Sequence, residues 1–309
     1  MLLQLLLVMI PSSSHSVVCF GETLWDFLPS GKQPGGAPMN VAYHLSKFGK
    51  NPAVISRVGN DSLGDELLSV MEEKGINTDY VQRDKELPTS TVVARLKDNH
   101  EMVYDIVQNV AWDNIMYDAS LNDLVKNADY FVFGSLAARN ARTRATLFQL
   151  LEVAKTKVLD INLRAPHYSR ELIETMLAKA DIVKLNEAEL KLIAAWFTTY
   201  TNDEDAISFL QEKFSINMMI VTKGAEGALF KVGNTLYSHD GYHVTVADTV
   251  GSGDSFLAGI IFQLPDHIAH ENILDFANKL GAFITTQKGA CPEYNLNEVT
   301  TAALAKRSA

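Results

Sequence analysis

The sequence predicts an α/β domain in which helices cover both faces of a parallel sheet. Apolar runs at residues 130–133, 157–161, 181–185 and 218–221 are each followed by sequence with helical periodicity. This alternation is typical of parallel strands that are buried on both sides. The length of 309 residues would allow two domains, but α/β folds of this length are commonly a single one.

Strands and helices already alternate in the first quarter of the chain. Residues 17–20 and 53–58 are apolar runs and predict strands, while residues 40–48 and 62–74 carry apolar side chains at helical spacing. Asp61 stands where the N-cap of the second helix is expected. The order of strand, helix, strand, helix matches the crossover connections that a parallel sheet requires.

The alternation stops between residues 88 and 113. Two β-rich stretches, 89–96 and 102–107, flank a polar turn and predict a hairpin inserted outside the main sheet. The last third of the chain then adds a hairpin and two helices. These are expected over residues 227–232 with 235–237, and over 254–264 and 272–287.

Charge and cysteine content narrow the range of partners. With 27 Lys and Arg against 37 Asp and Glu, the net charge of -10 repels phosphodiester backbones, so we expect no nucleic acid partner. Cys19 and Cys291 form no CxxC pair, which excludes a zinc ribbon or a disulfide scaffold and fits a reducing cytoplasm. Residues 1–16 are expected to be an extension outside the fold. Their apolar stretch, residues 1–10, is too short to cross a hydrocarbon core of about 30 Å, so no membrane segment is expected.

Two common nucleotide motifs are missing. The sequence contains no GxxxxGK[ST] phosphate loop, and its densest glycine cluster reads GxGxx followed by Phe256. A P-loop enzyme and a dinucleotide-binding enzyme are therefore both unsupported.

The segment 248–256 (DTVGSGDSF) precedes a strongly apolar helical run. Because Gly251 and Gly253 have no side chains, the backbone amides at this helix start stay accessible, which favours anion binding. A carboxylate at the same place, Asp254, would repel a phosphate unless it has a use, and accepting a hydroxyl proton during phosphoryl transfer is one. The alternative is that Asp254 only caps the helix.

Polar loops follow several other predicted strands. Gly35 and Gly36 let the backbone approach a small polar ligand beside Asn40, or else form a tight turn with Asn40 as N-cap. Residues 160–164 (DINLR) end a strand where open α/β sheets bind ligands, although a solvated strand end is the alternative.

Two further strand-end loops carry weaker signals. Asn186 and Glu189 are spaced as a capping box or as the outer shell of a magnesium ion. The loop Thr222-Lys223-Gly224 is short enough to be only a turn.

The joint order of these loops resembles that of the ribokinase-like, or PfkB, family of carbohydrate kinases. The resemblance covers essentially residues 17–302 and is carried by PGGAPMNVAYHLSKFG and DTVGSGDSFLAGI. It implies a doubly wound α/β domain with a small β-sheet lid from about residues 22–34 and 88–113, followed by a tail over 303–309. Ser252 and Ile161 depart from the family, which more often has Ala and Pro there.

The resemblance also implies a role for each matching residue. Asp254 would take the proton from the sugar hydroxyl, and the amides of Gly251, Ser252 and Gly253 would form the anion hole. The sugar would contact Asp26, Gly35, Gly36, Asn40, Asn162 and Arg164. ATP would contact Lys184, Asn186, Thr222, Gly224 and Asn278. Asn186 and Glu189 would orient Mg²⁺ through water, and Asp248 with the Val250 carbonyl would suit a monovalent cation such as K⁺.

The substrate is expected from the branch that the loops resemble. Residues 21–29 (GETLWDFLP), the GGAP stretch and residues 162–164 look most like fructokinases, which implies ATP-dependent phosphorylation of D-fructose at O6. The alternatives are 2-keto-3-deoxygluconate kinase, ribokinase and a non-catalytic sugar- or nucleotide-binding regulator. Trp25, Tyr104 and Trp112 would suit the core of the lid or the base pocket of a nucleoside kinase. A lid with one apolar face also predicts a homodimer.

Overall fold

The computed structural model describes residues 16–28, 31–96 and 102–307. Its main sheet has nine strands among these residues, in the order β13-β12-β11-β10-β9-β8-β1-β4-β5. The strands are β1 (Val17–Phe20), β4 (Ala53–Gly59), β5 (Val81–Asp84), β8 (Tyr130–Gly134), β9 (Lys157–Asp160), β10 (Ile182–Asn186), β11 (Met218–Thr222), β12 (Ala228–Val232) and β13 (Thr235–His239).

The sheet is parallel from β5 to β11, and its last two strand pairs, β11 with β12 and β12 with β13, are antiparallel. Strand β1 pairs with β4 on one side and with β8 on the other. The strand order reverses there, because the chain builds outward from β1 first through β4 and later through β8. Ligands of open α/β sheets bind at the carboxyl ends of strands beside such a reversal.

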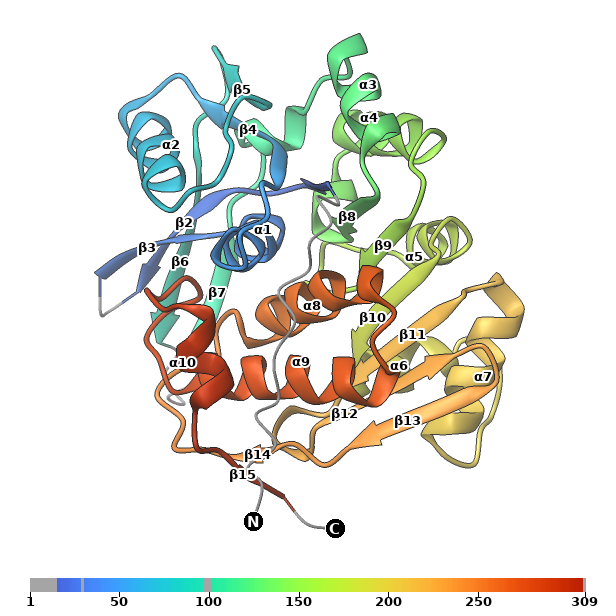
Figure 1. Ribbon diagram of the computed structural model, residues 1–309. Coiled ribbons are helices and arrows are strands. Elements are labelled where there is room, and N and C mark those ends of the chain that lie inside the picture. Colours follow the sequence, from blue (N-terminus) through green and yellow to red (C-terminus); the bar gives the residue numbers. More distant parts are fainter. Residues whose placement is uncertain (1–15, 29–30, 97–101, 308–309) are drawn as a thin grey trace.

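Helices cover both faces of this sheet, as Figure 1 shows. One face carries α1 (Ala37–Lys47), α2 (Ser62–Glu73), α8 (Ser252–Gln263), α9 (His270–Thr285) and α10 (Leu296–Thr301). The other carries α3 (Ala119–Asn127), α4 (Ala141–Leu151), α5 (Arg170–Leu177), α6 (Glu187–Ala194) and α7 (Asp203–Phe214). The doubly wound fold predicted from the sequence is confirmed.

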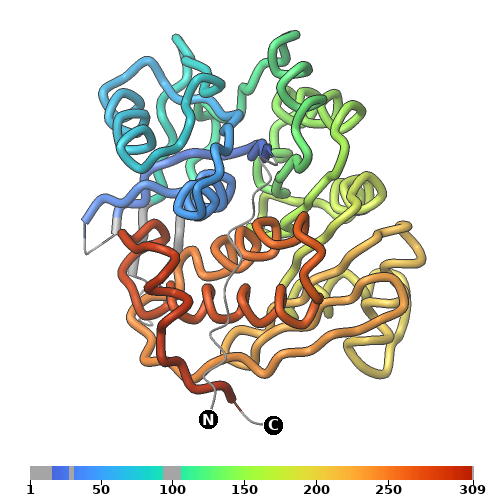
Figure 2. Tube along the Cα trace, in the orientation of Figure 1, coloured from blue at the N-terminus to red at the C-terminus, as the bar shows by residue number. Residues whose placement is uncertain are grey.

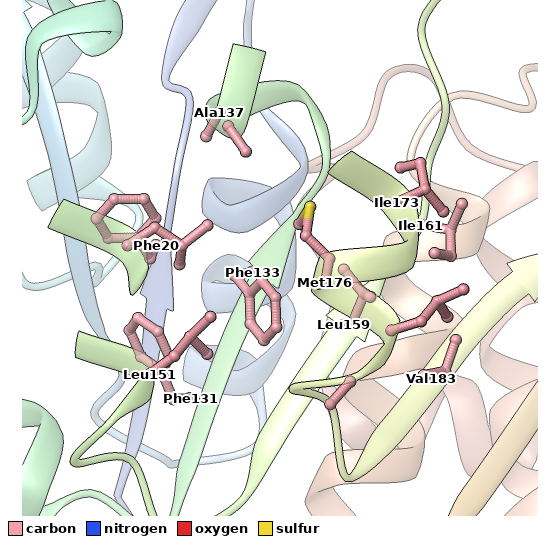
Figure 3. Close-up of a cluster of buried hydrophobic side chains, with 14 of the residues drawn as sticks. Phe20, Phe131, Phe133, Ala137, Leu151, Leu159, Ile161, Ile173, Met176 and Val183 are labelled. Carbon is pink, nitrogen blue, oxygen red and sulfur yellow. The ribbon is translucent and has the colours of Figure 1, made fainter. Parts of the chain in front are cut away.

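The two hydrophobic cores explain why the strands read as unbroken apolar runs. In β1, Val18 and Phe20 face one core while Val17 and Cys19 face the other, and all four are buried. Figure 3 shows the first core, in which Phe20 and side chains of β8, β9 and β10 pack with side chains of α4 and α5. A strand buried on both faces needs an apolar side chain at every position.

A second, four-stranded sheet stands outside the main one, in the order β3-β2-β6-β7. It consists of β2 (Leu24–Leu28), β3 (Gly31–Gly35), β6 (Ser90–Leu96) and β7 (Met102–Ile106). Strands β2 and β6 pair in parallel, while β2 with β3 and β6 with β7 form antiparallel pairs. We call this sheet the lid.

Several boundaries differ from the sequence prediction. Helix α1 begins at Ala37, three residues earlier than expected, because Gly36 serves as N-cap and Pro38 fits the first turn. Asn40 is therefore inside the helix and is not its N-cap. The sequence did not predict β5, α10, or the pair β14 (Tyr242–His243) and β15 (Ala305–Lys306), which takes in part of the expected tail.

The termini and cysteines complete the description. The first fifteen positions of the expected extension lie outside the described residues. Cys19 and Cys291 are both free thiols. Among the residues placed by the structure, no helix is long and apolar enough to span a bilayer.

Candidate active site

Helices α1 and α8 pack side by side on one face of the sheet (Figure 2). Asn40 lies in the first turns of α1 and Asp254 in the first turn of α8. The Nδ2 of Asn40 donates a hydrogen bond to Oδ2 of Asp254 at 2.8 Å. The two loops singled out in the sequence, 214 positions apart, therefore meet at one point.

Asp254 is not the cap of its helix. The N-cap of α8 is Gly251, which has no side chain to offer and adopts a left-handed φ of 76°. A Cβ at this glycine would lie 2.6 Å from the Cα of Ala290, so the position requires glycine. The capping alternative is wrong, and the carboxylate is half-buried beside the first-turn amides.

The surroundings of Asp254 make it a stronger base than an ordinary carboxylate. Burial, reinforced by the nearby Asp160 carboxylate, raises the pKa of Asp254 to about 6. The positive charge of Lys184 and the hydrogen bond from Asn40 oppose this rise. The carboxyl group is still mostly ionised at neutral pH, and its pKa lies closer to the pH of the solution than that of an ordinary Asp.

Cys291 fixes the orientation of the Asn40 amide. Its Sγ donates to Oδ1 of Asn40 at 3.4 Å, and burial raises the pKa of this thiol, so it keeps its proton. With Oδ1 accepting from sulfur, the amide nitrogen is the atom that faces Asp254. The chain of contacts from Cys291 to Asn40 to Asp254 holds the carboxylate in place.

A buried ion pair lies on the other side of Asp254. The Nζ of Lys184 donates to both oxygens of Asp160, at 3.0 and 2.8 Å. Burial alone would lower the pKa of Lys184, but Asp160 and Asp254 outweigh it and keep the amine charged. A Cβ added at Gly253 would lie 3.1 Å from this Nζ. The ammonium group and the α8 amides therefore form one positively polarised surface.

The lid contributes a second carboxylate. Asp26 of β2 lies directly against the backbone of Gly35 in β3, where any side chain would collide with its Oδ2. Burial raises the pKa of Asp26 to about 6, against the opposing charge of Arg164. Gly35 is therefore needed for Asp26 to take this position.

A third carboxylate, Glu22, sits under the start of α1. Its Oε1 accepts from the Ala37 amide at 3.3 Å, and a Cβ at Gly36 would collide with the Glu22 carbonyl. Burial raises the pKa of Glu22 to about 7. Glu22 thus replaces a side-chain N-cap for the helix that carries Asn40.

Arg164 is the cation that these carboxylates share. Its charge lowers the pKa of Glu22, of Asp26 and of Asp254. It extends from the loop after β9, where Asn162 adopts a left-handed φ of 40°. The structure therefore groups Arg164 with the residues expected to hold the sugar.

Asn186 and Glu189 form a complete capping box at the start of α6. Asn186 Oδ1 accepts from the Glu189 amide at 2.9 Å, and Glu189 Oε2 accepts from the Asn186 amide at 2.8 Å. Glu189 Oε1 also accepts from the Leu163 amide at 2.7 Å. Each carboxylate oxygen keeps one lone pair, so the cap and an outer-shell role toward a hydrated ion are compatible. Within the described residues, no group of three or more His, Cys, Asp or Glu side chains could hold a metal directly.

The expected nucleotide contacts lie at the same edge of the sheet. Asn186 and Thr222 are register partners at the carboxyl ends of β10 and β11. Gly224 follows with a left-handed φ of 59°. Asn278 lies on α9, which packs against α8, and donates its Nδ2 to the Leu274 carbonyl at 2.8 Å.

Asp248 holds the loop in front of α8. Its Oδ1 accepts from the Val250 amide and its Oδ2 from the Gly289 amide, both at 3.1 Å. This carboxylate ties the DTVGSGD loop to the end of α9.

Two of the aromatic residues expected in the lid pack into the two hydrophobic cores of the main sheet. Trp25 is 2% exposed and donates its Nε1 to the Leu63 carbonyl at 2.9 Å, and Trp112 is fully buried. The Tyr104 side chain lies outside the described part. The two tryptophans do not line an open base pocket.

A family model described as pfkB family carbohydrate kinase matches residues 14–295. The chain belongs to the pfkB family of carbohydrate kinases. This pfkB kinase is 30% identical over 310 residues to Fructokinase-2 of Solanum habrochaites, covering 91% of this chain and 93% of that relative. Its fold is similar to that of the fructokinase with bound ATP from Xylella fastidiosa, with a TM-score of 0.82, 24% identity and coverage of 94% and 98%. It is also similar to the fructokinase of Vibrio cholerae O395, solved with fructose, ADP and a calcium ion. The TM-score is 0.79 at 25% identity, and the match covers 93% of this chain and 98% of that chain.

Sequence reasoning missed two residues of this carbohydrate kinase site. Glu22 directly follows Gly21 at the end of β1, and Cys291 lies in the loop after α9. Glu22 contacts Ala37, 15 positions along the chain, and Cys291 contacts Asn40, 251 positions away, so no local spacing signals either residue. A buried carboxylate beside a helix start becomes visible only once the fold places it there.

Proposed function

We propose that this carbohydrate kinase transfers the γ-phosphate of ATP to O6 of D-fructose, with Asp254 as the general base. The observation that carries the proposal is the position of Asp254. Its carboxylate lies in the first turn of α8 without serving as the N-cap, and Asn40 orients it next to the first-turn amides. A group that accepts a proton and a site that attracts phosphate are thus adjacent.

The proposed step forms a bond between the sugar oxygen and the γ-phosphorus and breaks the bond from that phosphorus to the bridging oxygen of ADP. The hydroxyl proton passes to Asp254. The α8 amides at Gly251, Ser252 and Gly253 would stabilise the charge on the transferring group. The Ser252 amide donates to the Thr249 carbonyl at a long 3.3 Å, and a phosphate oxygen could replace that contact.

The sugar would lie between the lid and α1. Carboxylate and amide groups there offer acceptors and donors to several hydroxyls, and Arg164 adds a charged donor. The proposed sugar contacts are Asp26, Gly35, Gly36, Asn40, Asn162 and Arg164. The proposed nucleotide contacts are Lys184, Asn186, Thr222, Gly224 and Asn278.

Fructose is proposed as the substrate because the curated relative is named a fructokinase and covers nearly the whole chain. The Vibrio cholerae structure, at 25% identity, was solved with fructose and ADP. Ribose and 2-keto-3-deoxygluconate are the competing substrates.

The residues present fit an outer-shell magnesium site. Glu189 is a buried carboxylate with lone pairs left after its two backbone contacts, and Asn186 is exposed beside it. Mg²⁺ bound with ATP would neutralise charge on the phosphate oxygens. Asp248 and the Val250 carbonyl stay our proposal for a monovalent cation such as K⁺.

Two wider properties belong to the proposal. We propose a homodimer through the lid, supported by Phe27 of β2, which is 38% exposed, and by the unpaired outer edges of β3 and β7 within the described lid. Sedimentation showing a monomer at micromolar concentration would rule this out. We also propose a cytoplasmic location, supported by the two free thiols.

The proposed function is tested by measuring magnesium-dependent ATP consumption with fructose, ribose and 2-keto-3-deoxygluconate side by side. Asp254→Asn should lower kcat by a factor of about 10² to 10⁴, the usual contribution of a general base, while ATP binding persists. Asp240→Asn, an exposed carboxylate outside the site, should have no effect.

Three outcomes would change the conclusion. A different preferred sugar would move the enzyme to another branch of the family. Nearly unchanged turnover by Asp254→Asn would mean that another base operates. ATP binding without turnover on any sugar would favour a regulator that kept the fold without catalysis.

A further inference from the structure

A cavity of about 330 Å³ is lined by residues that are not among the proposed sugar and ATP contacts. Its wall joins three segments: the loop after lid strand β7, the start of α4, and the loop between β9 and α5. The volume falls within the range of small-molecule sites, roughly 300–1,000 Å³. Neither Asp254 nor the residues proposed above to bind sugar and nucleotide line it.

Arg139 supplies a buried cation to this wall, and its side chain is only 6% exposed. Its Nε and Nη2 each donate to the Asp113 carboxylate at 2.8 Å, and Nη2 also donates to the Val107 carbonyl at 2.6 Å. The guanidinium plane stacks on Trp112 with its central carbon 3.9 Å from the ring centre. Four contacts therefore fix the group in one orientation.

The remaining nitrogen of Arg139 has no partner. Nη1 is buried and makes no hydrogen bond to any residue that the structure describes. An unsatisfied buried donor of a charged group costs free energy. This nitrogen is closed off from solvent, so Arg139 adds positive charge to the wall but no free donor.

A second arginine makes the cavity electropositive. Because Asp113 balances Arg139, the half-buried Arg144 adds an unbalanced charge. Arg144 donates Nη1 to the Ala138 carbonyl at 3.3 Å, and no described carboxylate lies within ion-pair distance of it. A basic cavity in a chain of net charge -10 is selective for anions.

The rest of the wall is mainly hydrogen-bonding and uncharged. Gln108, Asn109, Asn140, Tyr168 and Ser169 provide amide and hydroxyl groups. Such a lining suits a ligand with several hydroxyls in addition to its charge. We propose that this cavity binds a sugar monophosphate, with its phosphate on Arg144, beside the charge of Arg139, and its hydroxyls on the amide and hydroxyl side chains.

The test is calorimetric titration of glucose 6-phosphate into the full chain, with fructose and a non-hydrolysable ATP analogue present to fill the active site. Arg144→Gln removes the unbalanced charge from the cavity. A charge-assisted hydrogen bond is worth about 1.5–3 kcal/mol, so this variant should bind about ten- to a hundredfold more weakly. Arg142→Gln is the matched control, because Arg142 is exposed on the same helix, outside the cavity, and donates to Asn114.

The proposal is supported if wild type and Arg142→Gln bind alike and Arg144→Gln loses affinity. It is overturned if no binding is detected at millimolar ligand, or if all three proteins bind equally. Inorganic phosphate is the second probe, and binding as tight as that of glucose 6-phosphate would overturn the sugar part of the assignment. Because the Arg144 and Arg142 variants locate the binding in this cavity, the result stands whether or not fructose proves to be the substrate.

Discussion

Removing the Asn40 amide should shift the pH dependence of catalysis. Asn40 donates to Asp254 at 2.8 Å, and this hydrogen bond holds the pKa of the carboxyl down against burial and Asp160. A hydrogen bond to a charged group is worth about 1.5–3 kcal/mol, and one pKa unit corresponds to about 1.36 kcal/mol. In Asn40→Ala the pKa of Asp254 should therefore rise from about 6 by about one to two units.

The sign follows from the role of a base. Asp254 must be ionised to accept a proton, so kcat/KM should rise with pH through its pKa and then level off. The acidic limb should lie near pH 6 in the wild type and move upward in Asn40→Ala. The assay is kcat/KM for fructose from pH 4.5 to about 9, because this ratio reports pKa values of the free enzyme.

Ser46→Ala is the control for this experiment. Ser46 lies near the far end of α1 and donates to the Tyr43 and Lys74 carbonyls, away from Asp254. The acidic limb of the kcat/KM profile of Ser46→Ala should match that of the wild type, even if the substitution destabilises the helix. A limb that stays in place in Asn40→Ala would refute the argument, since the contact would then not control the ionisation of the base.

Two further variants test the surroundings of the site. Burial raises the pKa of Glu22 from 4.5 to about 7, so between these pH values the native state binds more protons than the unfolded state. The free energy of unfolding therefore falls as the pH rises from 4.5 to 7. Glu22→Gln, which can still accept from the Ala37 amide, should therefore gain up to about 3 kcal/mol relative to wild type between pH 4.5 and 8; equal differences in melting temperature at both pH values would contradict this. Gly251→Ala should lose both stability and turnover, because its Cβ would clash with Ala290. Gly233→Ala, also at positive φ but with open space around it, should cost only about 1 kcal/mol by denaturant unfolding and leave turnover intact.

The sequence predicted the sheet well where burial is two-sided. Strand β8 and residues 218–221 of β11 are apolar because their side chains pack into both cores. Strand β5 was missed because it is a polar edge strand, and its sequence VQRD carries no periodic signal. The pair of β14 and β15 joins Tyr242 to Lys306, and such short strands exist only through their long-range pairing.

The candidate site was predictable as a set of loops but not as a set of contacts. Asn40 and Asp254 both belong to recognisable segments, and the α/β topology brings those segments to one edge of the sheet. The alternatives at Asn186 and Glu189 could not be separated by sequence because the capping box leaves lone pairs free for a second role. Local spacing describes only the cap.

The sequence did not predict the contacts that compensate the charge of a carboxylate at a phosphate-binding site. A helix start attracts anions, and Asp254 occupies that place with its own negative charge. Lys184, balanced by Asp160, and the amide of Asn40 offset this charge, and Cys291 fixes the amide from 251 positions away. Because each partner comes from a different element, the charge balance arises only in the fold. Residues that look locally unfavourable are expected to gather at such a site, since their stabilisation is supplied by tertiary structure.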